Sequence, residues 1–378
     1  MKIVLTGGGT GGHFYPLIAV AEELNNIIDE EKLINTKLIY MSDAPYDKRM
    51  LDEKEIKFRK ITSGKIRRYF SFLNITDAIK IILGTIRTLF VIYTEFPDVV
   101  FGKGGYASFP VIFAARFFRI PVVIHESDVV PGRVNKWASK FAKRIAVSFP
   151  ESINHFPEKT RNKIAVVGNP VRESLIRLPK EGFSEFLQLD KSVPVVFILG
   201  GSQGSQKINN IVVDMASELS SKYQVIHQCG KINFKETEGR VAVALENSPF
   251  KNRYRVFGFL NESAMKMSAA ASDIIISRAG SSAIFEIASW GKPSILIPLT
   301  GSAQDHQREN AYAFARTGAS EVIEERNLSP HILLSEIDRI LSQKEQLEEV
   351  RIKANQFYKP NAGHQIAREI INIALEHA

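Results

Sequence analysis

This chain repeats one unit of sequence, which consists of a short apolar run, a glycine-containing turn and a helix-like segment. Of all the features of the sequence, this repeated unit limits the possible folds most strongly. The runs with their turns are residues 3–12 and 99–105 in the first half, and residues 195–204 and 273–281 in the second. Alternation of this kind is typical of parallel sheets with helices on both faces. We therefore predict an α/β protein with two Rossmann-like domains.

The length of the chain supports two domains, because 378 residues exceed one ordinary core. The first set of units ends near residues 166–172. We predict an N-terminal domain over 1–168, a C-terminal domain over 169–345, and a helical segment over 346–378 that packs back toward the N-terminal domain. Open parallel sheets bind ligands at the carboxyl ends of their strands. We expect the two sheets to face a central cleft.

The cysteine content and the apolar stretches indicate the compartment. Cys229 is the single cysteine, which excludes an internal disulfide and a thiolate metal site and is typical of the cytoplasm. The sequence after Met1 runs into glycines without the apolar core of a signal peptide. Residues 79–93 and 109–118 are the longest apolar stretches; both are interrupted by charges, and neither is predicted to span a membrane.

Positive charge concentrates in residues 60–144, where fourteen Lys or Arg stand against five Asp or Glu. Large apolar residues are interleaved with these cations, above all in residues 65–73 and 113–119. A solvated basic face would explain the charge alone. Cations beside aromatic side chains also suit an anionic membrane surface, and single-stranded nucleic acid accepts the same combination.

The first glycine-rich turn, residues 7–13 with the sequence GGGTGGH, contains the dinucleotide fingerprint G-x-G-x-x-G. Its backbone N–H groups and the helix dipole suit an anion such as a pyrophosphate, a phosphate or a leaving diphosphate. A nicotinamide dinucleotide needs an acidic residue about 20 positions later. Asp43 lies well beyond that distance, so the sequence permits a dehydrogenase without requiring one.

A second glycine-rich turn, residues 200–205, takes the corresponding place in the second half. Either turn alone is explained by close packing of a strand against a helix. Two such turns at one cleft could hold a nucleoside diphosphate on one side and an acceptor pyrophosphate on the other. The pair therefore favours a nucleotide-dependent transfer reaction over a purely structural role.

Further polar residues follow the other expected strands. His125 and Glu126 end one of them, where they suit catalysis or merely local hydrogen bonds. Glu286 lies one turn into an expected helix, where a carboxylate can accept from ribose hydroxyls or act as a helix-end charge. Gln307 and Asn310 are three residues apart, so one helical face could present both amides to sugar hydroxyls.

No metal-binding pattern is evident in the sequence. The eight histidines form no H-E-x-x-H pair, and no D-x-D of the kind that holds a metal-bound sugar nucleotide is found. We expect neither a metal nor a cofactor. The charge of a diphosphate would instead be met by helix dipoles, backbone donors and Arg172.

Taken in order, these motifs resemble the MurG family of N-acetylglucosaminyltransferases, in glycosyltransferase family 28, which has the GT-B fold. The residues that carry the resemblance span 7–311 and read GGGTGGHFYPLIAVAEEL, GKGGYASFP, IPVVIHESDVVPGRVNK, VGNPVRE, ILGGSQGSQKIN, SRAGSSAIFEIASWGKPSILIPL and QDHQRENA. The resemblance implies transfer of N-acetylglucosamine (GlcNAc) from UDP-GlcNAc to the lipid-linked muramyl acceptor lipid I, giving lipid II for peptidoglycan.

The resemblance also implies roles for individual residues. The positions that match donor-binding residues, for UDP-GlcNAc, are Thr10, Gly11, Gly12, Arg172, Ser202, Leu260, Glu286, Gln307 and Asn310. The positions that match acceptor-side residues are Tyr106, His125 and Asp128. Some members carry Asn in place of Asp128, which leaves a donor contact there in doubt. The candidates for the catalytic base are His13 first and Glu126 second, with a purely structural His13 as the alternative.

The implied chemistry is a single displacement at the sugar's anomeric carbon by the C4 hydroxyl of the acceptor. An α-linked donor then gives a β-linked product, and inversion needs one base rather than a nucleophile pair.

A lipid-linked acceptor implies docking to an anionic membrane surface on the cytoplasmic side of the bacterial plasma membrane. The predicted membrane patch consists of Arg67, Arg68, Phe70, Phe72, Phe117 and Arg119. Cell-wall or division proteins are further candidate partners, and no nucleic acid is expected.

Three other functions compete with this one. The first is a nicotinamide-dependent dehydrogenase, which would use the first glycine-rich turn but would give residues 200–205 no role. A sugar-nucleotide or membrane-binding protein without activity would bind UDP without turnover. Another GT-B enzyme with a soluble acceptor would differ only in the N-terminal domain.

Overall fold

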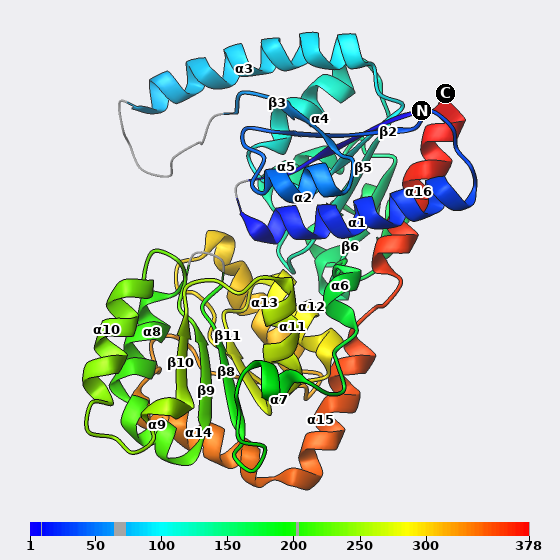
Figure 1. The fold of residues 1–378 in the computed structure, drawn as a ribbon. Helices are drawn as coiled ribbons and strands as arrows, with labels where there is room; N and C mark the ends of the chain where they lie inside the picture. The colour runs from blue at the N-terminus through cyan, green and yellow to red at the C-terminus, as the bar shows by residue number, and fades with distance from the viewer. Residues whose placement is uncertain (9, 64–72, 202–203, 378) are drawn as a thin grey trace. The chain divides into compact units, whose positions relative to one another are not determined.

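The computed structural model describes residues 1–8, 10–63, 73–201 and 204–377 (Figure 1). The chain divides into two compact units. The N-terminal unit comprises Met1–Arg172 together with Lys359–Ala378, and the C-terminal unit comprises Glu173–Tyr358. No helix in the described part of the chain is long and apolar enough to cross a membrane.

The N-terminal unit is built on a seven-stranded parallel sheet with the strand order β3-β2-β1-β4-β5-β6-β7. Its strands are β1 (Lys2–Thr6), β2 (Lys37–Ser42), β3 (Lys57–Lys60), β4 (Val99–Gly102), β5 (Val122–Glu126), β6 (Arg144–Val147) and β7 (Ile164–Val166). Its helices are α1 (Gly11–Glu30), α2 (Lys48–Glu53), α3 (Leu73–Glu95), α4 (Ser108–Phe117), α5 (Arg133–Ala138) and α16 (Ala362–His377), with the 3-10 helices η1 (Pro150–His155) and η2 (Glu158–Lys163).

The C-terminal unit repeats this architecture with a six-stranded parallel sheet in the order β10-β9-β8-β11-β12-β13. Its strands are β8 (Val195–Leu199), β9 (Gln224–Gln228), β10 (Tyr254–Phe257), β11 (Ile274–Ser277), β12 (Ser294–Leu296) and β13 (Ser320–Val322). Its helices are α6 (Glu173–Ile176), α7 (Phe183–Phe186), α8 (Gln206–Asp214), α9 (Ala216–Lys222), α10 (Phe234–Ala244), α11 (Glu262–Ala271), α12 (Ser281–Trp290), α13 (His306–Ala315), α14 (Pro330–Ser342) and α15 (Lys344–Phe357), with η3 (Lys251–Arg253) and η4 (Ala303–Asp305).

The central strands of both sheets are mostly apolar and buried, because helices cover both faces of a parallel sheet. Every residue of β4, β8 and β11 is buried. Period-two alternation is therefore absent, and the short apolar runs of the sequence appear as fully buried strands.

The C-terminal helix α16 packs on α1 within the N-terminal unit (Figure 1). Ile366 and Ile370 share one buried cluster with Leu17 and Leu24. At the rim, the Arg368 guanidinium forms an ion pair with Glu31, the residue that follows α1. Helix α16 therefore completes the hydrophobic core of the N-terminal unit, to which α1 also contributes.

The units differ in extent from the predicted domains of residues 1–168, 169–345 and 346–378. Residues 169–172 stay with the N-terminal unit, where Arg172 stacks on Tyr15. Helix α15 stays with the C-terminal unit, because Phe357 packs against the rings of Phe285 and Phe314, each at 4.9 Å between ring centroids.

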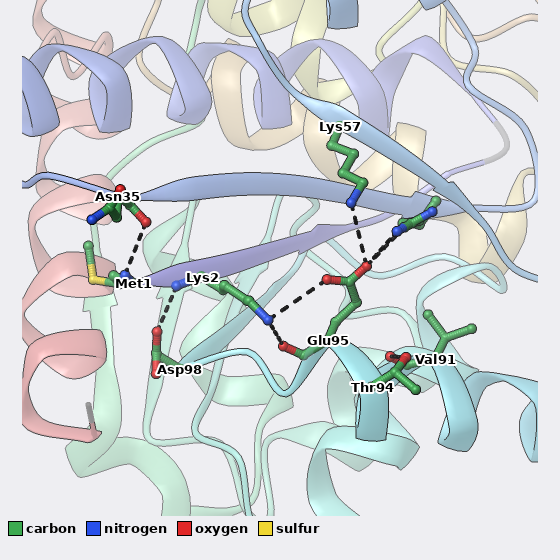
Figure 2. Close-up of polar contacts among 9 residues, drawn as sticks. Met1, Lys2, Asn35, Lys57, Val91, Thr94, Glu95 and Asp98 are labelled. Carbon is green, nitrogen blue, oxygen red and sulfur yellow. Dashed lines mark hydrogen bonds and ion pairs between the residues drawn. The ribbon is translucent and has the colours of Figure 1, made fainter.

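An ion-pair cluster fixes the end of α3 against the sheet of the N-terminal unit (Figure 2). The Glu95 carboxylate lies 2.9 Å from Arg59 and 3.8 Å from Lys57, both on β3. The Lys2 amine donates to the Glu95 carbonyl, and the backbone N–H of Lys2 donates to Asp98 at 2.6 Å. These contacts join β1, β3 and the end of α3.

Candidate active site

The carboxyl ends of neighbouring strands bring several predicted residues of the N-terminal unit together. Thr6, at the end of β1, pairs in register with Gly102 at the end of β4, and Gly102 pairs with Ile124 of β5. The turn before α1, the loop after β4 and the loop after β5 therefore start at one edge of the sheet. Parallel sheets place ligand sites at this edge.

His13 lies in the first turn of α1, with its side chain partly exposed. Its Nδ1 lies 3.1 Å from the Thr10 hydroxyl. Gly105 approaches the opposite side of the ring closely: a β-carbon on Gly105 would lie 3.6 Å from His13 Nε2 and 3.1 Å from the Gly8 carbonyl. Gly105 has φ +80, a conformation that glycine adopts without strain. These glycines let the loop after β4 lie against the imidazole.

Tyr106 is held over the same edge by an acidic residue. Its hydroxyl donates to Asp43 Oδ2 at 3.0 Å, and the Ser63 hydroxyl donates to the same oxygen at 3.1 Å. Burial and this hydrogen bond raise the pKa of Tyr106 to about 12. Tyr106 therefore stays protonated and can act as a hydrogen-bond donor, and Asp43 emerges as its partner rather than as a nucleotide contact.

Glu126 is buried, and its carboxylate organises the loop that follows β5. Oε1 accepts from the backbone N–H of Asp128 at 3.1 Å, while Oε2 accepts from Gly132 at 3.0 Å and from the Asn135 amide at 2.9 Å. Burial raises the pKa of Glu126, and the Asp128 carboxylate raises it further. Both carboxylate oxygens thus hold the loop that carries Asp128.

His125 is fully buried beside Lys103, which is also buried. Its Nδ1 lies 2.5 Å from Lys103 Nζ, and its Nε2 lies 3.0 Å from the Gly168 carbonyl and 3.2 Å from the Ser148 hydroxyl. Burial, followed by the nearby Lys103 charge, lowers the pKa of His125 well below its usual range. The ring is neutral, and both its nitrogens make contacts inside the unit.

Arg172 is buried, and its guanidinium lies 4.1 Å from the centroid of the Tyr15 ring. Tyr15 follows His13 by two residues on α1, so Arg172 stands beside the first turn of that helix. Ser202, also predicted as a donor contact, lies outside the described residues, as do Arg67, Arg68, Phe70 and Phe72 of the predicted membrane patch. Gly11 and Gly12 open α1 as expected.

In the C-terminal unit, the second glycine-rich turn is seated on the end of β9. The backbone N–H of Gly200 donates to the Gln228 carbonyl at 3.0 Å. Gly204 has φ +79, and a β-carbon there would lie 2.2 Å from the Cys229 carbonyl. That carbonyl also accepts from Asn209 and Asn233, each at 3.0 Å. The Asn209 and Asn233 side chains thus hold the Cys229 carbonyl against Gly204. Because that carbonyl lies so close, only glycine fits at position 204.

The remaining predicted donor residues occupy three different environments. Leu260 is buried and precedes Asn261, whose side chain caps α11. Glu286 is partly exposed on α12. Gln307 lies in the first turn of α13, and its Oε1 accepts from the backbone N–H of Leu299 at 3.0 Å.

The structure separates the two amides that were predicted to share one helical face. Asn310 is fully buried, and its amide donates to the Ala279 carbonyl at 3.3 Å. Its position three residues after Gln307 turns it toward the β11–α12 connection, where it fixes the backbone. Gln307 remains partly exposed.

Sequence reasoning did not assign several residues that build the site. Lys103 was not singled out from its motif. Its position between two glycines at the end of a strand was a signal that could have identified it. Asn135 and Asn169 lie in loops whose hydrogen bonds depend on tertiary structure. Arg278 and Glu325 form a largely buried ion pair at 2.5 Å, and Glu325 also accepts from the backbone N–H of Thr300.

Metal-ligating side chains do not gather in the described part of the chain. No group of three or more His, Cys, Asp or Glu that could hold an ion occurs among residues 1–8, 10–63, 73–201 and 204–377.

Comparison with known proteins matches both units to one family. The N-terminal domain of glycosyltransferase family 28 matches residues 3–147, and its C-terminal domain matches residues 195–366. A Clostridium novyi (strain NT) protein, named UDP-N-acetylglucosamine--N-acetylmuramyl-(pentapeptide) pyrophosphoryl-undecaprenol N-acetylglucosamine transferase, is 37% identical over 91% of this chain and 91% of its own length. A Treponema denticola protein of the same name is 36% identical over 88% of this chain and 86% of its own length.

The chain belongs to glycosyltransferase family 28.

Solved structures agree with this family 28 assignment. The crystal structure of Acinetobacter baumannii MurG superposes with a TM-score of 0.71 at 27% identity, covering 98% of this chain and 99% of that one. The UDP co-structure of S. aureus MnaA has a TM-score of 0.72 at 14% identity, covering 100% of this chain and 98% of that one, and shows the fold alone. The prediction of two Rossmann-like domains of the GT-B type is confirmed, and the dehydrogenase alternative is excluded.

The close contact between Gly204 and the Cys229 carbonyl can be tested by substitution. Gly204→Ala should lower the free energy of unfolding by at least about 1 kcal/mol, since φ +79 alone costs an alanine that much and the added carbon meets the Cys229 carbonyl. Gly280→Ala is the control, because its φ is −68 and no heavy atom lies within 4 Å of the added carbon. Urea unfolding measures both. Equal stability of the two variants would contradict this geometry.

Proposed function

We propose that this chain transfers GlcNAc from UDP-GlcNAc to the C4 hydroxyl of the N-acetylmuramyl unit of lipid I, giving lipid II. The main support is that relatives named for this transfer match about nine tenths of the chain, across both units. The site adds a chemical reason, because a partly exposed imidazole stands among glycine-rich turns at the edge where nucleotides and phosphates bind.

His13 is the base that the geometry favours. A base must reach the hydroxyl that it deprotonates, and His13 is partly exposed, whereas His125 and Glu126 are buried with their polar atoms in internal hydrogen bonds. We assign proton acceptance to Nε2, because Thr10 lies at Nδ1 and can fix the tautomer. Glu126 then acts as a positioning residue for the loop that carries Asp128.

The leaving UDP is stabilised by charge and backbone dipoles in this proposal. Arg172 supplies a cation to the diphosphate, and the turn before α8 supplies backbone N–H groups at a helix N-terminus. Glu286 accepts from the ribose hydroxyls, Gln307 reads the sugar, and the backbone of Leu260 meets the uracil. The Tyr106 hydroxyl gives its proton to Asp43, so its oxygen accepts a hydrogen bond from the acceptor. No step is assigned to a metal or a cofactor.

Release of UDP tests this function. The purified chain should release UDP from UDP-GlcNAc only when a short-chain lipid I analogue is present, with UDP-N-acetylgalactosamine a poor donor. His13→Ala should lower kcat by about 10²- to 10⁴-fold, the usual contribution of a general base, and leave UDP affinity within about threefold. His155→Ala is the control, because that histidine is exposed on η1.

The outcomes separate the competing functions. UDP binding without acceptor-dependent release would favour the binding protein or a different acceptor. Normal turnover of His13→Ala would remove His13 as the base while leaving the transferase intact.

We also propose that the N-terminal unit docks peripherally on an anionic membrane, on the side where lipid I presents its sugar to the cytoplasm. Exposed apolar side chains line α3 and α4, and they are Ile82, Leu83, Ile86, Phe90, Tyr93, Phe113 and Phe117. Arg87, Arg116 and Arg119 are exposed among them. Apolar groups that enter the interface beside cations are the features that anionic membranes bind. The α3 residues are added here to the predicted patch, of which Phe117 and Arg119 lie in the described part of the chain.

Vesicle sedimentation tests this docking. Phe90 and Phe117 are 68% and 65% exposed, so Phe90→Ser with Phe117→Ser should weaken binding to anionic vesicles by at least about 10-fold, since each ring contributes roughly 1.5–3 kcal/mol when buried. Phe186→Ser is the control, because Phe186 is a ring of the C-terminal unit that is 55% exposed. Unchanged binding of the double variant, or equal binding to zwitterionic vesicles, would contradict the proposal.

A further inference from the structure

Lys103 is the most deeply buried charged side chain of the site and has no role in the reaction as proposed so far. It follows β4 and is 1% exposed. Its amine donates to Asn169 Oδ1 at 2.8 Å and lies 2.5 Å from His125 Nδ1. Burial lowers its pKa. A buried amine has a desolvation cost that a methionine of similar length would not have, so packing alone does not account for it.

The direction of each hydrogen bond follows from the groups involved. The Gly168 carbonyl can only accept, so the His125 Nε2 that lies 3.0 Å from it carries the ring proton. Nδ1 is then an acceptor, and Lys103 is its donor. Lys103 thus fixes residues 168–169 in two ways. It donates directly to Asn169, and by donating to Nδ1 of His125 it keeps the ring proton on Nε2, which donates to the Gly168 carbonyl.

The segment that Lys103 holds leads directly to Arg172. Residues 167–172 lie outside any helix or strand, so side chains contribute strongly to their placement. Asn169 is buried, Gly168 has φ +86, and three residues later the Arg172 guanidinium stacks on Tyr15 of α1. The chain that Lys103 holds at Asn169 therefore leads within three residues to the cation beside the first turn of α1.

We propose that Lys103 is a positioning residue of the transferase: through Asn169 and His125 it fixes residues 168–172 and so places Arg172 for the donor's diphosphate. This inference rests on the proposed role of Arg172. Lys103 itself does not touch the substrate. Its loss should weaken UDP binding and raise the KM for UDP-GlcNAc more than it lowers kcat, because the base on α1 remains in place.

The test measures UDP affinity by titration calorimetry on the full chain. Lys103→Met keeps the length of the side chain and removes both donors, and it should raise the Kd for UDP by about 10-fold, within the range seen for residues that act through others. Lys292→Met is the matched control. Lys292 is a second desolvated lysine, whose amine donates to the Ala270 and Ser272 carbonyls at the end of α11, so its loss should leave the Kd unchanged.

A double-mutant cycle with Arg172 separates positioning from general destabilisation. Arg172→Met alone should raise the Kd for UDP, and adding Lys103→Met should raise it little further, because the cation that Lys103 places is already absent. Additive losses, or an unchanged Kd in folded Lys103→Met, would overturn the inference. An unchanged Kd in Arg172→Met would instead remove the proposed role of Arg172.

A second pair of variants covers the case in which Lys103→Met does not fold. Asn169→Leu removes the oxygen that accepts from Lys103, whereas Asn169→Asp keeps one. Asn169→Asp should retain more UDP affinity than Asn169→Leu. Equal affinities in these two variants would also overturn the inference.

Discussion

Parallel strand pairing is the constraint on which the rest of this structure depends. Every described strand of each sheet runs in the same direction, so all the loops after the strands leave from one edge. In the N-terminal unit this edge carries the turn before α1 and the loops after β4 and β5. In the C-terminal unit the corresponding edge of its own sheet carries the turn before α8. Groups that are far apart in the sequence, such as His13 and Gly105, meet at the edge of the N-terminal unit because pairing in register brings their strand ends together.

At this edge the structure divides its polar residues into a buried framework and a small exposed set. His125, Glu126, Asn135 and Lys103 bond to one another or to loop backbone, and these contacts together fix the loop after β5. His13 remains partly exposed. The division explains how one histidine can serve as a base while its neighbour in the site only holds the chain.

The fold was predictable from the sequence, because strand, glycine turn and helix follow one another repeatedly in both units. The site was predictable only in part. His125 and Glu126 were found as polar residues at a strand end, but burial decides what they do, and burial depends on the loops after β5 and β7. Lys103, Asn169 and Asp43 act through contacts between residues distant in sequence. Asn310 is a residue that the sequence assigned wrongly to an exposed face. Its spacing from Gln307 suggested that both amides share one exposed helical face, but tertiary packing buries Asn310.

The linkage of the product tests the central claim most directly. The chain would be incubated with UDP-GlcNAc and a short-chain lipid I analogue, in buffer containing a chelator, and the new anomeric centre examined by proton NMR. The account predicts GlcNAc joined in the β configuration to C4 of the muramyl unit, because a single base-assisted displacement inverts an α-linked donor. An α-linked product, or free GlcNAc with no sugar on the acceptor, would contradict it.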